Sequence, residues 1–172
     1  MSLPDRTMIS TASLACIGLQ ARANGFQAIG AGAVWPSANR AIFVPLLLRS
    51  QIQVKRLFAL NAAAVSGNID VGIYTFDGTL IVSTGGTAQL GIVQPQFFDI
   101  TDLTLPPGKY YLAAALDNIT GTNQRSNPAI VICRGIGILQ MATAYPLPTT
   151  AVFATVASAY IPAIGIETVR GI

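Results

Sequence analysis

The sequence predicts an all-β protein, a jelly-roll-like antiparallel β-sandwich that carries an extended N-terminal arm. Short apolar stretches with alternating polarity recur through most of the chain, turn residues separate them, and no sustained helical period interrupts them. About eight such strands divide evenly into two four-stranded sheets. The long connections at residues 84–92 and 118–127 suit crossings between sheets better than tight hairpin turns.

Residues 67–85 carry the most distinct strand signal and predict a β-hairpin. Two apolar runs flank Asp77-Gly78, a pair that readily accepts positive φ at both central positions of a type I′ turn. The first run alternates with a period of two, which predicts that at least one of its faces is covered by a second sheet. One face carries Ile69, Val71 and Ile73, and the other carries Asp70, Gly72 and Tyr74.

The other strands are predicted in order along the chain. Residues 41–48 contain Pro45, which suits an edge or bulged strand because proline cannot donate to a ladder. The alternation of residues 51–61 slips near Arg56, which indicates a bulge, and three consecutive alanines within residues 109–117 indicate close packing on both faces. Residues 118–127 are expected to be a polar surface loop. Further strands are expected over residues 89–100, 128–138, 151–157 and 160–169.

Residues 1–40 are expected to form the arm and residues 41–172 the sandwich domain. Several glycines and Pro36 interrupt the arm, although residues 11–23 are compatible with a short helix. The arm is too apolar for a solvated linker, so we expect it to bind a neighbouring molecule. The alternative is that it folds back onto its own domain as an edge strand. The expected partner-binding residues are Phe26, Ile29, Val34 and Trp35.

The composition points to association between copies of the chain. Charged residues make up 10% of the 172 residues and hydrophobic ones 52%, against about a quarter charged in typical soluble domains. We therefore expect a homo-oligomer, with a trimer as the expected form. The net charge of +3 comes from scattered residues without a basic run, so no nucleic-acid partner is expected. Three prolines interrupt the uncharged residues 135–166, so no membrane partner is expected either.

The residue types favour a non-enzymatic protein without cofactor or metal. The chain has no histidine, which excludes Ser-His-Asp and Cys-His pairs and the commonest zinc ligand. Cys16 and Cys133 make no disulfide framework and are expected to be free, buried residues, as suits a reducing cytoplasm. Asp99 and Asp102 are the closest acidic pair for glycosidase chemistry, and with Asp117 they have oxygen ligands for calcium. The simpler interpretation is that Asp102 caps a turn and Asp99 faces solvent.

Four aromatic residues raise the question of sugar binding, because rings on one exposed face can stack on a sugar. Aromatic residues on strands belong more often to the core, and that is the expectation here. Neighbours in a strand point to opposite faces, so Tyr110 and Tyr111 cannot both serve one platform. The residues concerned are Trp35, Tyr74, Tyr110 and Tyr111.

Four stretches of the chain resemble small β-sandwich proteins encoded among the virion genes of tailed bacteriophages. They are NRAIFVPLLL, VKRLFALNAAAVSGNIDVGIYTFDGTLIVSTG, FFDITDLTLPPGKYYLAAALDN and ATAYPLPTTAVFATVASAYIPAIGI, within residues 38–168. The resemblance implies a virion component assembled in the host cytoplasm, either a capsid decoration (cement) protein or part of a tail fibre. Its partner would be the major capsid protein or another virion protein, and no catalytic motif is implied.

Two of these motifs also resemble carbohydrate-binding sandwich modules, namely VGIYTFDGTLI and PPGKYYLA. This second resemblance implies the alternative function, a tail-fibre receptor-binding or carbohydrate-binding module whose ligand is a host-surface glycan. An enzyme that uses Asp99 and Asp102 is a third interpretation.

Overall fold

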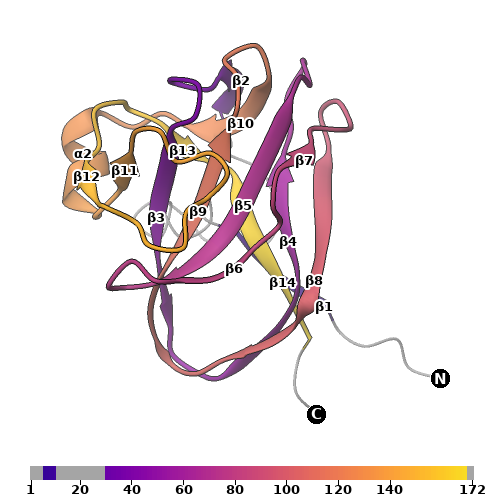
Figure 1. Cartoon of the computed structure of the whole chain (residues 1–172), viewed down its shortest axis with the longest axis vertical. Helices are drawn as coiled ribbons and strands as arrows, with labels where there is room; N and C mark the ends of the chain where they lie inside the picture. The colour runs from indigo at the N-terminus through magenta and orange to yellow at the C-terminus, as the bar shows by residue number, and fades with distance from the viewer. Residues whose placement is uncertain (1–5, 11–29, 170–172) are drawn as a thin grey trace.

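The computed structural model describes residues 6–10 and 30–169 of the chain. The described residues form antiparallel sheets and one short helix (Figure 1), so the predicted all-β class is confirmed. The strands are β1 (Arg6–Ser10), β2 (Gly30–Val34), β3 (Ala41–Leu48), β4 (Ile52–Leu60), β5 (Asn68–Thr75), β6 (Leu80–Ser83), β7 (Thr87–Ala88), β8 (Pro95–Leu105), β9 (Gly108–Leu116), β10 (Thr122–Ser126), β11 (Leu139–Met141), β12 (Ala154–Thr155), β13 (Ile161–Pro162) and β14 (Ile164–Val169), and the helix is α2 (Ile130–Gly135).

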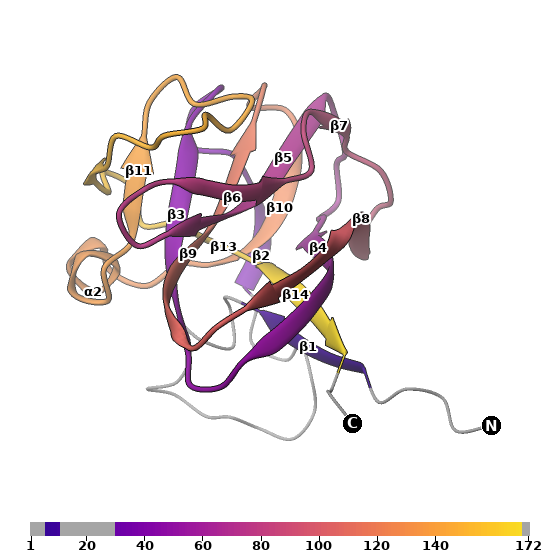
Figure 2. The ribbon, with the colours of Figure 1, turned by 60° about the horizontal axis from the view of Figure 1, so that its bottom comes forward.

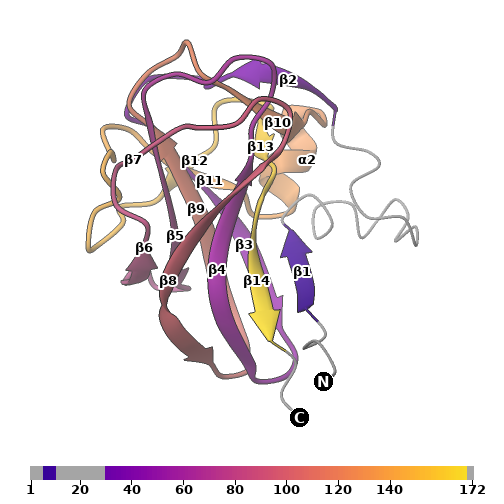
Figure 3. The same cartoon turned by 90° about the vertical axis from the view of Figure 1, so that its right-hand side faces the viewer.

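The described strands form three sheets. The four-stranded sheet has the order β1-β14-β4-β8, and the largest sheet has the order β12-β11-β3-β9-β5-β6, with β7 paired to β5 beside this path. The third sheet has the order β13-β10-β2. Figure 3 shows the four-stranded sheet in front of the strands of the largest sheet.

Two neighbouring connections link the largest sheet to the four-stranded sheet: β3 continues into β4, and β8 continues into β9. β3 pairs with β9 as far as Leu48 and Gly108, and β4 pairs with β8 from Ile52 and Leu105 onward. The two short connections therefore run side by side around one end of the molecule, at the bottom of Figure 1. The chain returns to the four-stranded sheet between β7 and β8, in residues 89–94, which overlap the crossing predicted at residues 84–92.

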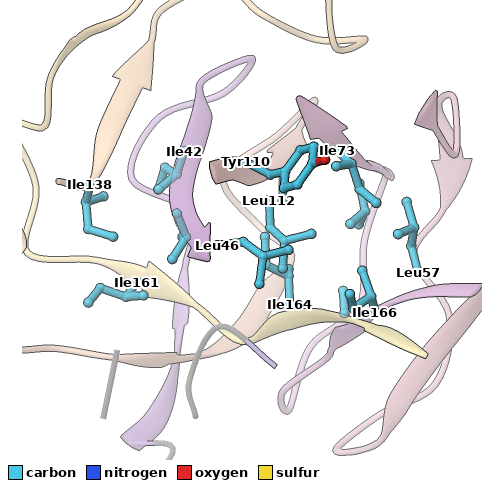
Figure 4. Close-up of a cluster of buried hydrophobic side chains, with 14 of the residues drawn as sticks. Ile42, Leu46, Leu57, Ile73, Tyr110, Leu112, Ile138, Ile161, Ile164 and Ile166 are labelled. Atoms are coloured by element: carbon cyan, nitrogen blue, oxygen red, sulfur yellow. The ribbon is translucent and has the colours of Figure 1, made fainter. Parts of the chain in front are cut away.

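One hydrophobic core lies between these two sheets (Figure 4). The alternating side chains of β3, β5 and β9 point into it, as do those of β4 and β14, and their burial supplies the main stabilisation of the domain. Ile69, Val71 and Ile73 are fully buried there, as the hairpin pattern predicted. Other members are Ile42, Leu46, Leu57, Leu112, Ile164 and Ile166.

The predicted hairpin is confirmed as β5 and β6, but its turn is not type I′. A type I′ turn needs positive φ at both Asp77 and Gly78, and only Gly78, at +95°, has it. The Gly78 N–H donates to the Thr75 carbonyl at 3.1 Å, and the Thr75 N–H donates to the Thr79 carbonyl at 2.9 Å. This pattern is typical of the longer hairpin loop in which a left-handed glycine follows a tight turn.

The opposite face of the largest sheet is also covered, by a segment that the sequence did not assign to it. The segment 142–153, which we call the outer strap, packs on β3, β5 and β9 and forms a second hydrophobic cluster with them. Leu147 approaches β5 so closely that a Cβ on Gly72 would lie 2.8 Å from its Cδ1. β9 is therefore buried on both faces, as its alanines predicted.

Two further expectations about the strands prove correct in detail. Pro45 lies in β3 beyond the three residues that pair with β11, so β3 is an edge there on the side away from β9. The register of β4 shifts between Val54 and Arg56 against β8. This irregularity lies next to the position where the alternation of the sequence slips.

The predicted strand 151–157 is a strand only at Ala154–Thr155, the predicted strand 89–100 is observed at Pro95–Leu105, and two further segments differ in the type of element. The predicted polar loop 118–127 contains strand β10, which pairs with β2 and β13. The predicted strand 128–138 contains the six-residue helix α2, which buries Cys133. In both segments, long-range contacts override local propensity, which is only a weak guide over a few residues.

The described parts of the predicted arm belong to the sheets of the domain. β1 pairs with β14 over five residues, and β2 pairs with β10 (Figures 1 and 2). The alternative in which the arm folds back as an edge strand therefore describes these two segments. The short helix considered for residues 11–23 lies outside the described residues. No helix in the described part of the chain is long and apolar enough to cross a membrane.

The hairpin turn yields a stability prediction. We expect Gly78→Ala to destabilise the protein by about 1–3 kcal/mol, because the new Cβ would lie at positive φ and 2.9 Å from the Ala151 carbonyl oxygen. Gly85→Ala is the matched control, since Gly85 also has positive φ, at +64°, but a Cβ added there would have no atom within 4 Å. Chemical denaturation of both variants should show the larger loss for Gly78→Ala, and equal losses would contradict a role for the contact with Ala151.

Candidate functional site

The four residues predicted to bind a partner fall into different environments. Phe26 and Ile29 lie outside the described residues. Val34, at the end of β2, is 53% exposed, whereas the next residue, Trp35, is only 1% exposed. Val34 is thus available on the surface of the chain, and Trp35 is not.

Trp35 belongs to the core of its own chain. Its indole Nε1 donates to the Arg40 carbonyl at 2.8 Å. Its ring packs edge-on against Tyr160, with the centroids 5.2 Å apart, and burial of the tyrosine raises the pKa of its hydroxyl. A deletion that removes Trp35 would therefore open the core, and any contact of the arm with a partner has to come from other residues.

The tyrosines considered as a sugar platform are also buried, so the expectation that they belong to the core is confirmed. The Tyr74 hydroxyl donates to the Pro148 carbonyl at 2.6 Å, and burial raises its pKa. The Tyr110 hydroxyl donates to the Pro106 carbonyl at 2.9 Å. These contacts hold the outer strap and the β8–β9 turn in place rather than offering rings to a ligand.

One aromatic ring is half-exposed on the uncovered end of the outer sheet face. Phe76 stacks on Tyr111, with an interplanar angle of 6° and a centroid distance of 5.3 Å. The Lys109 ammonium lies 5.4 Å from the centre of the Phe76 ring. Leu47, which pairs with Lys109 across the strands, is exposed beside them. The sequence analysis did not identify Phe76 as a candidate binding residue, because its exposure depends on where the outer strap ends.

The acidic residues considered for catalysis or calcium binding are not gathered. Asp99 faces solvent, as expected, with Arg56 Nε 3.9 Å from its carboxylate. Asp102 forms an ion pair with Lys55 rather than capping a turn. Among the described residues, no three His, Cys, Asp or Glu side chains lie together as a metal site would require. Asp99, Asp102 and Asp117 thus do not form a calcium site.

Asp117 serves as an acceptor for a neighbouring turn. The Asn68 N–H donates to its Oδ1 at 3.0 Å, and the Asn68 side chain donates to its Oδ2 at 2.8 Å. Burial alone would raise the pKa of Asp117, but the hydrogen bonds from Asn68 and Asn118 together lower it. Asp117 therefore holds the start of β5 against the end of β9.

Asp70 is the most deeply buried carboxylate among the described residues, and the sequence pattern did not single it out. It lies on the outer face of β5 and accepts the Leu147 N–H at 2.9 Å and the Thr84 hydroxyl at 3.1 Å. Burial raises the pKa of Asp70, and the bonds from Leu147, Thr84 and Ser83 partly oppose this rise. The sequence did contain an indication that this face of β5 is buried, because Gly72 and Tyr74 share it and neither residue is typical of a solvated strand surface.

A second polar cluster lies between the strands and loops at the opposite end from the β3–β4 turn. The Gln89 side chain donates to Asn61 Oδ1 at 2.9 Å and accepts the Ser66 N–H at 3.0 Å. The Asn61 side chain donates to the Leu90 carbonyl at 2.6 Å, and Asn123 Nδ2 lies 3.3 Å from Asn61 Oδ1. Buried amides with satisfied partners fix the loops that they join. Only the tertiary structure brings these residues together.

The buried Asp70 carboxylate predicts a pH-dependent stability. An acid whose pKa is higher in the folded than in the unfolded chain holds its proton more tightly when folded. Its stabilising contribution therefore falls as the pH rises from its ordinary pKa of 3.8 through the raised value. We expect the unfolding free energy of the wild type, relative to Asp70→Asn, to decrease from about pH 4 toward neutrality. Urea denaturation at several pH values measures this difference.

Asp117→Asn is the control of opposite sign. Because the pKa of Asp117 is lowered in the folded chain, its contribution is present above pH 3.8 and is lost as the pH falls. The stability of the wild type relative to Asp117→Asn should therefore increase with pH. Wild type and Asp70→Asn profiles that stay parallel would show that Asp70 is not the group responsible.

Comparison with known proteins gives no relative for this chain: no family model, no curated protein and no solved structure matches it.

Proposed function

We propose that this chain is a non-enzymatic structural protein of a bacteriophage virion, an oligomeric capsid decoration or cement protein built on a jelly-roll-like sandwich. The observation that carries the proposal is the amount of apolar surface left exposed on a chain with few charges. Exposed apolar groups that gather on a soluble protein usually mark an interface. Among the described residues, the exposed large apolar ones are Val34, Leu47, Phe76, Leu90, Ile92, Val93, Phe97, Ile119, Val131, Ile132, Ile136 and Val152.

The resemblance of four stretches to virion sandwich proteins supplies the context of the proposal. In that context the chain assembles in the host cytoplasm, as a trimer, and binds the major capsid protein or another virion protein. A cement protein needs a rigid body with several apolar surfaces, so that copies contact one another and the shell. The double cover of the largest sheet and the exposed apolar residues fit this requirement.

The acidic side chains support a structural role. Asp70 holds the outer strap, Asp117 holds the start of β5, and Asp102 pairs with Lys55. Each of these carboxylates makes contacts that join separate segments of the chain. The enzyme interpretation based on Asp99 and Asp102 gains no support from their separate cations, Arg56 and Lys55.

A receptor-binding or carbohydrate-binding module of the tail is the second candidate, and the exposure of Phe76 favours it. The ring is half-exposed and stacked on Tyr111 with Lys109 beside it. Exposed aromatic faces held rigidly from behind can stack on the apolar face of a sugar. The buried tyrosines and Trp35 do not contribute to this surface, so Phe76 would carry the interaction.

The leading proposal predicts the location of the protein in the virion. Purified particles of the phage whose genome encodes the chain should show it on the outer capsid surface, with a sandwich-sized density at a fixed symmetry position. Electron cryomicroscopy combined with antibody labelling measures this. Labelling of the fibre tips would favour the receptor-binding candidate, and particles that lack the chain altogether would contradict both virion functions.

The alternative predicts a role for Phe76 in glycan binding. If the chain is a carbohydrate-binding module, wild-type protein should bind a subset of a bacterial glycan array, and Phe76→Ala should lose at least about tenfold in affinity, as expected when a stacked ring is removed. Phe97→Ala is the matched control, because Phe97 is another exposed ring and lies under Arg56 on the other sheet. An array without any bound glycan would remove the support for this candidate.

A further inference from the structure

Loops and strand ends that carry no charged side chain gather at the end of the molecule where β2, β7 and the start of β10 lie, in the upper part of Figure 1. Four segments meet there, and backbone bonds join them, for example Ala62 N–H to the Thr122 carbonyl at 3.0 Å and Val93 N–H to the Ala62 carbonyl at 3.0 Å. We call this region the uncharged end. It consists of the described residues 32–36, 61–67, 88–95 and 118–123, none of which is Asp, Glu, Lys or Arg. Two charged residues border it: Asp117, which accepts the Asn118 side chain at 2.6 Å, and Arg125 in β10.

The uncharged end is apolar at its surface. Ile92 is 60% exposed and Val93 is 62% exposed, and both lie in the connection between β7 and β8. The buried amides Asn61, Gln89 and Asn123 lie beneath them and fix the loops. The surface is therefore preorganised, which lowers the entropic cost of binding. The other exposed apolar residues of this end are Val34, Leu90 and Ile119.

Val93 adds an independent observation, because its backbone is strained. Its φ is +53°, in the left-handed region that β-branched residues strongly avoid. The strain is held by the Val93 N–H bond to Ala62, yet the side chain that it presents is exposed and gains no burial within the chain. Strain of this kind collects at functional surfaces, so the side chain is presented to something outside the domain.

We propose that the uncharged end is the surface through which copies of this chain associate around a symmetry axis. The proposal rests on the oligomeric part of the proposed function and names the contact. In a closed symmetric assembly, the same surface of each copy lies near the symmetry axis. A charged side chain close to the axis would therefore face the same charge on the neighbouring copies and be repelled by it. The chain has a net charge of +3, and this end avoids that repulsion.

Two of the other apolar surfaces, the one around Phe76 and the one on α2, are less suited to self-association. Leu47 and Phe76 have Lys109 beside them, and Val131 and Ile132 share the short helix α2 with Arg134. Symmetric contact there would bring like charges together at the interface, where charged residues are depleted. These surfaces suit a different protein with acidic groups better than a second copy.

A lipid surface fits the uncharged end less well than a second copy. Apolar tips that enter membranes are usually flanked by Lys or Arg that attract anionic headgroups. Arg125 is the first basic residue after this end along β10, and it donates to the Asn127 side chain at 2.6 Å and to the Ala159 carbonyl at 2.9 Å. Asp117, on the other side, is turned toward Asn68. Within the part of the chain that the structure describes, the surface thus lacks the basic rim that a membrane would recruit.

The test compares two exposed apolar residues on different surfaces of the full chain. The wild type should sediment at a multiple of the 17.9 kDa chain mass at micromolar concentration. Ile92→Asp should raise the dissociation constant by about 30-fold or more, as expected for a central interface residue. Val131→Asp is the matched control, since Val131 is 70% exposed on α2, and it should sediment as the wild type does. Circular dichroism confirms that each variant is folded.

A third variant separates assembly from folding. Val93→Gly removes the side chain and relieves the positive φ, so it should weaken assembly while leaving the domain at least as stable as before. Thermal unfolding of Val93→Gly combined with Ile92→Asp, compared with Ile92→Asp alone, measures the effect of the glycine on the stability of the monomer without a contribution from assembly. Unchanged assembly in Val93→Gly and in Ile92→Asp would overturn the proposal.

The remaining outcomes distinguish the two proposals. An oligomer that Val131→Asp dissociates and Ile92→Asp does not would place the contact on α2, which overturns this inference and leaves the proposed function standing. A wild type that stays monomeric would overturn the inference together with the oligomeric part of the proposed function. Binding of a monomeric wild type to phosphatidylcholine vesicles, lost in Ile92→Asp, would show that the occupant is a lipid surface and would likewise overturn it.

Discussion

The burial of β9 on both faces is the constraint on which the rest of the structure depends. Its side chains alternate between the two hydrophobic clusters, and Ala113, Ala114 and Ala115 keep both covering layers close. A strand buried in this way needs a cover on each side. The four-stranded sheet, whose own strands are joined by regular backbone pairing, covers one side. The outer strap covers the other side with a few backbone bonds, such as Leu80 N–H to the Thr149 carbonyl at 2.9 Å, and with side-chain anchors such as Asp70 and the Tyr74 hydroxyl.

The two ends of the molecule differ because the strand connections differ. At one end, two short turns carry paired strands from sheet to sheet and leave little room for variation. At the other end, four longer segments meet, and buried amides replace the ladder that the strands no longer provide. Polar groups are thus used beneath the surface, while apolar side chains lie on it. This arrangement suits contact with another protein better than the binding of a small polar ligand.

Much of the fold could be predicted because the alternation of apolar and polar residues along a strand indicates which of its side chains are buried. The strand predicted over residues 41–48 is observed with the same bounds, and the observed bounds of β9 differ from the predicted 109–117 by a single position at each end. The inward face of β5 was also correct, since Ile69, Val71 and Ile73 are all buried. These features depend on neighbours in sequence, and a period of two requires no knowledge of the partner strand.

By itself, then, the sequence determined the all-β class, the central strands and the core role of Tyr74, Tyr110 and Tyr111. The tertiary structure decided that the polar residues 122–126 form a strand, that Trp35 fills the core of its own chain instead of contacting a partner, and that Asp70 is buried beneath the outer strap. It also brought Ile92 and Val93 together with loops far away in the chain. The reason is physical: a polar or aromatic residue is compatible with several environments, and its burial depends on partners that only the folded chain brings to it.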